Sequence, residues 1–61
     1  MAREYWFCFF TPTQFAGEEK LTPEAARERT QFLAESYEAP VECYRGKSER
    51  LDGSESPFAT A

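Results

Sequence analysis

The fold is decided by residues 4–10, Glu-Tyr-Trp-Phe-Cys-Phe-Phe, where apolar side chains are more concentrated than anywhere else in the 61-residue chain. A short run of apolar, mostly aromatic residues is typical of a β-strand. Successive side chains of a strand point to opposite faces of its sheet. One set is Tyr5, Phe7 and Phe9, and the other is Trp6, Cys8 and Phe10. Because both sets are apolar, we expect both faces of this strand to be covered.

A helix is predicted over residues 23–38. Thr22 can accept hydrogen bonds from the first turn, and Pro23 suits the first helical position. Apolar residues then recur at helical spacing, and Pro40 stops the pattern. The residues of this apolar stripe are Ala25, Ala26, Thr30, Phe32, Leu33 and Tyr37.

The remaining segments have weaker signals. Residues 13–21 are predicted to be a loop that turns at Gly17. Residues 41–45 alternate as a second strand does, and the Gly46-Lys47 pair suits a hairpin turn into a short third strand over 48–51. The last residues are rich in Gly, Ser and Pro and are predicted to form a flexible tail, from which Phe58 could dock on the core.

These elements predict an α+β fold, a single small β-α-β-β domain over residues 1–52 with a flexible C-terminal tail over 53–61. One helix would pack on one face of a two- to three-stranded sheet. The helix joins the first two strands, so we expect these strands to be parallel, with the third antiparallel to the second. The pattern does not decide which face of the first strand meets the helix. The other face would have no cover within the chain.

The composition excludes several classes of ligand. With 7 basic and 11 acidic residues the net charge is −4, whereas nucleic acids and anionic membranes attract basic surfaces. No apolar run approaches the roughly 18 to 20 residues of a membrane span. We therefore expect a cytoplasmic protein that binds neither nucleic acid nor membrane.

The residues of common active sites are also missing. The chain has no His, so neither a Ser-His-Asp nor a Cys-His arrangement can form, and two Cys without His make a metal site improbable. Its three glycines are too far apart for a phosphate-binding loop, and we expect no cofactor. Cys8 and Cys43 are interpreted as reduced core residues, with a redox switch as the alternative.

The excess of aromatic residues is the main functional signal, because aromatic side chains dominate protein interfaces. We expect a small non-catalytic binding or regulatory protein that uses an aromatic sheet face or the open edge of its first strand. Its partner would be a second copy, giving a homodimer, or another protein, as in a phage-type or bacterial inhibitor of a larger protein. The predicted partner-binding residues are Tyr5, Trp6, Cys8, Phe10 and Tyr44.

The alternative is a small oligomeric enzyme or ligand-binding protein whose pocket forms between subunits. One helix on three strands is too shallow for a deep pocket, so an oligomer would have to supply the concavity. Arg29, Arg45 or Tyr44 would then hold an anionic substrate.

Overall fold

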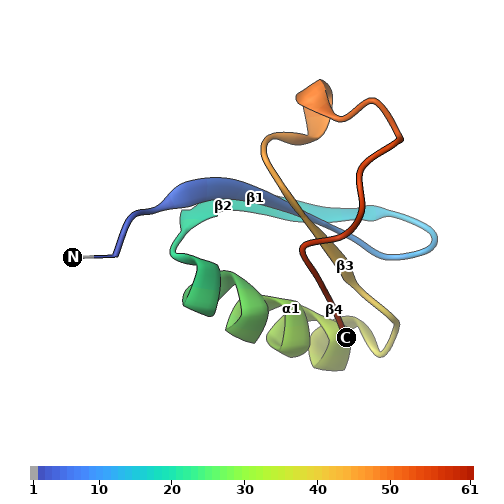
Figure 1. The fold of residues 1–61 in the computed structure, drawn as a ribbon. Helices are drawn as coiled ribbons and strands as arrows, with labels where there is room; N and C mark the ends of the chain where they lie inside the picture. Colours follow the sequence, from blue (N-terminus) through green and yellow to red (C-terminus); the bar gives the residue numbers. More distant parts are fainter. Residues whose placement is uncertain (1) are drawn as a thin grey trace.

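The computed structural model describes residues 2–61 and has an α+β fold, as the sequence predicts. One helix lies below a sheet, and the segment that joins the last two strands passes above it (Figure 1). In chain order the elements are β1 (Tyr5–Phe10), β2 (Phe15–Leu21), α1 (Pro23–Tyr37), β3 (Glu42–Arg45), the 3₁₀ helix η1 (Ser48–Arg50) and β4 (Ala59–Thr60).

The four strands form one sheet in the order β2-β1-β3-β4, and every neighbouring pair is antiparallel. The predicted parallel pairing of the first strand with residues 41–45 is therefore wrong. The chain already reverses in the β1–β2 hairpin before it enters the helix. Consequently α1 joins β2 to β3, the two strands that flank β1, and β1 has no open edge.

β2 replaces the loop predicted over residues 13–21. Its Gly17, Glu18 and Lys20 are poor strand formers, so propensity did not reveal it. The hairpin turn is stabilised locally, because the Thr11 amide donates to the Gln14 carbonyl at 2.8 Å and the Gln14 amide donates to Thr11 Oγ1 at 3.0 Å. Pairing with the whole length of β1 then supplies the backbone hydrogen bonds of the strand.

The predicted helix is confirmed with its cap. Thr22 Oγ1 accepts a hydrogen bond from the Ala25 amide at 3.1 Å, and Pro23 occupies the first turn. Glu38 ends the helix in the left-handed conformation at φ 52°, and the Ala39 amide donates to the Ala34 carbonyl at 3.2 Å. These bonds satisfy carbonyls that the last turn leaves free.

The core lies between α1 and one face of the sheet. Its fully buried residues are Phe7, Phe9, Ala26, Val41 and Cys43. The β1 side chains that meet the helix are therefore those of the set with Phe7 and Phe9. The sequence pattern had not decided which of the two sets this would be. Thr30 is the buried polar residue of this layer, and its hydroxyl donates to the Ala26 carbonyl at 2.7 Å.

The C-terminal segment differs most from the prediction. Residues 48–50 form η1 rather than a third hairpin strand. The segment predicted to be a tail ends in β4, which pairs with β3, while Val41 and Ala61 exchange two backbone hydrogen bonds of 3.0 Å. The Phe58 ring lies 4.9 Å from that of Phe7. Burial of this ring and the backbone pairing offset the entropy that ordering the segment costs.

Candidate protein-binding site

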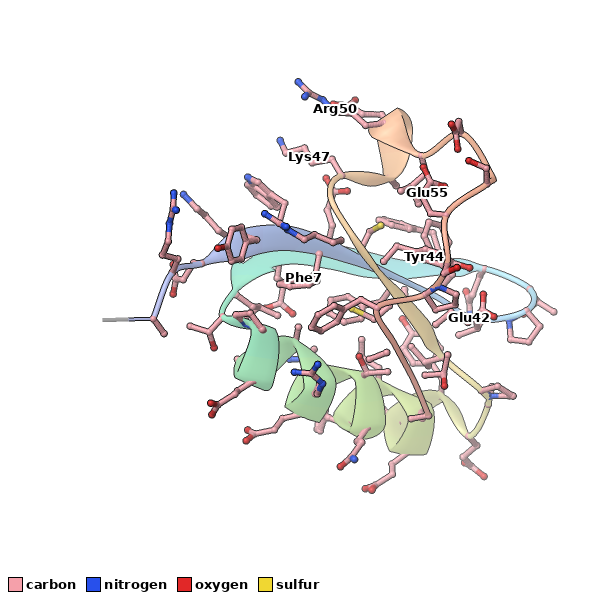
Figure 2. All side chains as sticks on the ribbon, viewed as in Figure 1. Phe7, Glu42, Tyr44, Lys47, Arg50 and Glu55 are labelled. Atoms are coloured by element: carbon pink, nitrogen blue, oxygen red, sulfur yellow. The ribbon has the colours of Figure 1, made fainter. Side chains whose placement is uncertain are left out.

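The face of the sheet opposite α1 is the candidate site, and we call it the outer face. It carries one set of β1 side chains with their neighbours on β2 and β3. These residues are Trp6, Cys8, Phe10, Phe15, Glu18, Lys20, Glu42 and Tyr44. Residues 46–57, which we call the arm, lie against this face (Figure 2). The expectation that the chain leaves this face without cover is thus wrong for part of it.

Four contacts hold the arm on the sheet. The Gly46 amide donates to the Trp6 carbonyl at 2.6 Å, and Lys47 Nζ lies 4.4 Å from the centre of the Trp6 ring. Glu18 Oε2 accepts two hydrogen bonds from Ser48, from its amide at 3.1 Å and from its hydroxyl at 3.2 Å. Gly46 has a φ of 113°, a backbone conformation that favours glycine at the point where the arm leaves β3.

Cys8 is fully buried on the outer face and its thiol is not accessible to a partner, which corrects its predicted role. Burial raises the pKa of its thiol to about 11, and the charges of Cys43 and Glu18 add to the effect. Cys43 is buried on the opposite face of the sheet, where burial also raises its thiol pKa. The two thiols leave the sheet in opposite directions and are both free, so the structure does not bring them together as a redox pair.

A groove of about 240 Å³ opens between the arm and β3. The ring of Tyr44 meets that of Phe10 edge to face at 5.9 Å, and these two rings line the groove together with Leu51. Glu42 and Glu55 complete the lining with their carboxylates, next to Gly53. The groove therefore has apolar walls and a negative rim.

The carboxylates of the rim are held in place by hydrogen bonds. Tyr44 Oη donates to Glu42 Oε1 at 2.8 Å, and this bond raises the pKa of the tyrosine. The Glu55 carboxylate accepts from the amides of Asp52 and Gly53 at 3.0 and 3.2 Å. The side chain and amide of Ser54 donate to Asp52 and lower the pKa of its carboxyl. The acidic loop of the arm is thus preformed.

The opposite end of the arm is basic. A second groove, of about 320 Å³, is lined by Trp6 with Lys47 and Arg50, and also by Gly46 and Glu49. Figure 2 shows Lys47 and Arg50 at one end of the arm and Glu55, Tyr44 and Glu42 toward the other. The two grooves of the outer face therefore differ in charge.

The outer face contains four of the five residues predicted to bind a partner. Trp6 is exposed, Phe10 and Tyr44 are half-buried, and Cys8 is covered. Tyr5 points to the helix side of the sheet, where the Arg45 guanidinium lies 3.8 Å from its ring centre. Tyr5 therefore does not belong to this site.

Sequence reasoning missed Phe15 and the side chains of the arm. Phe15 is 48% exposed and its ring lies 5.4 Å from that of Phe10. A bulge between Phe9 and Phe10 shifts the β1–β2 register and makes Phe15 the partner of Phe10. No sequence pattern marks this bulge, and the polar composition of the arm indicated a tail.

Within a single chain, the three residues named for the enzyme alternative lie apart from one another. Arg29 Nη1 pairs with Glu19 Oε2 at 3.2 Å, and Arg45 stacks on Tyr5. Tyr44 points to the other face of the sheet from Arg45, its neighbour in β3. Within residues 2–61, no three side chains of the types that ligate metals gather at one point.

No helix in the described part of the chain has the length and apolar character needed to cross a membrane. No protein-family model, curated protein or solved structure matches the chain. The contacts and charges of the outer face are therefore the basis on which a function is argued.

Proposed function

We propose that this protein is a non-catalytic protein-binding domain, and that its groove between the arm and β3 binds a basic, extended segment of a partner protein. The observation that carries this proposal is the lining of the groove: the rings of Phe10 and Tyr44 stand beside the carboxylates of Glu42 and Glu55. A small acidic domain of this kind would act by occupying a basic surface of a larger protein.

The lining favours a cationic side chain with an apolar stem. Lys and Arg bind the faces of aromatic rings, and Arg also forms paired hydrogen bonds with carboxylates. The stem of either side chain can pack against Leu51 while its charge reaches Glu55. The net charge of −4 would add a long-range attraction for a basic partner.

Two further features support binding of a protein rather than of a small molecule. The groove of about 240 Å³ is small and open, whereas pockets for small molecules enclose most of the ligand. Beyond the groove the outer face presents Trp6, 39% exposed, and Phe15, 48% exposed. Aromatic residues of this kind provide much of the affinity of protein interfaces.

A peptide-display selection on the immobilised full chain tests the proposal. We expect enriched peptides to contain Lys or Arg next to apolar residues. The double variant Glu42→Gln, Glu55→Gln should weaken binding of an enriched peptide by about tenfold or more and should reduce its salt dependence. Affinities can be measured by fluorescence anisotropy of a labelled peptide.

Glu35→Gln is the matched control, because Glu35 is an exposed carboxylate on α1, away from the outer face. This variant should bind as the original chain does. Enrichment of acidic or purely apolar peptides, or equal loss of binding in the control and the groove variant, would overturn the proposal.

A further inference from the structure

One edge of the sheet offers a long strand without a neighbour. β2 has seven residues and pairs with β1 alone, whereas β4 at the other edge has two residues. An edge strand presents a row of backbone N–H and C=O groups that a second strand can bind. This edge is separate from the groove of the outer face.

The direction of the free backbone groups follows from the register. The Trp6 carbonyl accepts from Gly46 on the β3 side, so Trp6 directs its backbone groups away from β2. Lys20 is the β2 partner of Trp6, and the pair is of the non-hydrogen-bonded kind. Backbone groups alternate in direction along an antiparallel strand. The N–H and C=O groups of Glu18 and Lys20 therefore point to the open edge, whereas those of Glu19 point to β1.

We propose that β2 pairs antiparallel with β2 of a second copy, in a register centred on Glu19, so that two sheets join into one continuous sheet. The interface is then a two-fold dimer in which the same edge contributes twice. This inference goes beyond the proposed partner groove, because it concerns another site and another partner.

Charge selects the register. With Glu19 at the centre, Glu18 stands opposite Lys20 of the second copy, and Lys20 stands opposite Glu18 of the second copy. The backbone groups of Glu18 and Lys20 point to the open edge, so each Glu18–Lys20 pair would also be a hydrogen-bonded pair of the new ladder. A register centred on Glu18 or on Lys20 would lose both of these opposite-charge pairs and would place Glu18 or Lys20 opposite its own copy, which destabilises a sheet.

The interactions of the two acidic residues are compatible with this pairing. Glu18 Oε2 is engaged by Ser48, while no hydrogen bond to Glu18 Oε1 is present among the described residues. Glu19 meets its own copy at the centre of the register. Its charge is opposed by Arg29, which lies 3.2 Å away, so each copy brings a paired carboxylate rather than a free one.

The helix side of this edge is open, and it carries apolar side chains beside the charged Glu28 and Arg29. A groove of about 310 Å³ lies along the seam of β2 and α1, with Leu21, Ala25 and Phe32 among its lining residues. Phe32 is 56% exposed, the highest value among the large apolar residues. Antiparallel pairing about a two-fold axis keeps both helices on the same side of the sheet. The two seams would therefore face each other and cover the Phe32 side chains.

The register also leaves space for the Leu21 side chain at the dimer seam. Leu21 would stand opposite Gly17 of the second copy, on the helix side of the sheet. A Cβ atom at Gly17 would have no atom within 4 Å, so the space beside this residue is open. A larger residue opposite Leu21 would crowd the seam.

Size-exclusion chromatography with light scattering tests the dimer on the full chain. At about 100 µM we expect twice the chain mass of 7.0 kDa. Lys20→Glu should raise the dissociation constant by about tenfold or more, since it places Glu opposite Glu at two symmetry-related positions. The exchange Glu18→Lys, Lys20→Glu restores opposite charges and should restore the dimer.

A second variant acts on the backbone. Lys20→Pro removes the N–H that points to the open edge, and proline is tolerated in an edge strand where the N–H faces outward. This variant should stay folded by circular dichroism and become monomeric. The groove variant Glu42→Gln, Glu55→Gln should remain a dimer, so the two proposals can fail separately.

Two outcomes would overturn the inference. A monomer at about 100 µM would mean that the charges of β2 shield a solvent-exposed edge from association. A dimer that tolerates both Lys20→Glu and Lys20→Pro would have its interface elsewhere.

Discussion

The two faces of the sheet begin from equally apolar halves of β1 and end in different states. Phe7 and Trp6 are neighbours in this strand, yet Phe7 is fully buried under α1 and Trp6 is 39% exposed. A regular helix presents a continuous apolar stripe and covers the centre of its face. The arm lacks such a stripe, and grooves remain between it and the sheet. The difference indicates that the helix face holds most of the core, whereas the outer face keeps exposed aromatic side chains, on which the proposed binding rests.

The largest expected loss of stability comes from replacing Phe7, and the same replacement of Trp6 should cost much less. Phe7→Ala should cost about 3–5 kcal/mol of unfolding free energy, because it leaves a cavity in the core. At about 0.05–0.15 kcal/mol per residue, a domain of this size has little more stability than that, so the variant should be largely unfolded. Urea unfolding followed by far-UV circular dichroism measures the effect.

Trp6→Ala is the matched substitution on the outer face. It should cost about 1 kcal/mol or less, because Trp6 is 39% exposed and the groove beside it is already open to solvent, so its removal leaves no closed cavity. Equal destabilisation by the two substitutions would contradict the assignment of the core to one face.

The next prediction concerns Phe58, which packs at the edge of the core between the helix and the sheet. Phe58→Ala should cost about 2–4 kcal/mol, because its ring packs on Phe7 and lies under the Arg27 guanidinium, 4.6 Å from its centre. Thermal or urea unfolding measures the loss. Ser56→Ala, in the exposed part of the arm, is the control and should have little effect. A Phe58 variant as stable as the original chain would mean that the segment is a flexible tail after all.

The last effect concerns the pH dependence of the outer face, and at neutral pH it is not seen. The thiol pKa of Cys8 rises from 9.0 to about 11 on burial. Between these values the unfolded chain ionises and the folded chain does not. Stability should be fully present below pH 9.0 and should fall by about 1.4 kcal/mol per pH unit above it, until the folded thiol ionises.

Urea midpoints measured across this pH window under reducing conditions test the effect. Cys8→Ala removes the contribution of this thiol, and its stability should fall less steeply with pH than that of the original chain. Identical slopes would show that the arm leaves Cys8 open to water.

Much of the candidate site could be predicted from the strand pattern alone. Trp6 and Phe10 share a face because side chains alternate, and Tyr44 joins them because β3 alternates in the same way. Tyr5 was wrongly included because spacing treats the two faces of β1 as equal. The position of the helix on one side of the sheet decides between them, and that position depends on strand order and crossover handedness.

Other parts of the site could not be predicted, because distant contacts create them. Cys8 is fully buried on a face that the sequence left open, and the arm that lies against this face begins far along the chain and is held by Glu18. Phe15 enters the site through a bulge in the pairing of β2 with β1. Neither feature has a local signature in the residues concerned.

The sequence by itself determined β1 and α1. The aromatic run of residues 4–10 and the cap at Thr22 with Pro23 act within a few positions, so local propensity and periodicity predict both elements. Only the tertiary structure decided β2, β4 and the course of the arm. Residues such as Gly17, Glu18 and Thr60 have weak preferences of their own, and backbone pairing with β1 and β3 makes them strands.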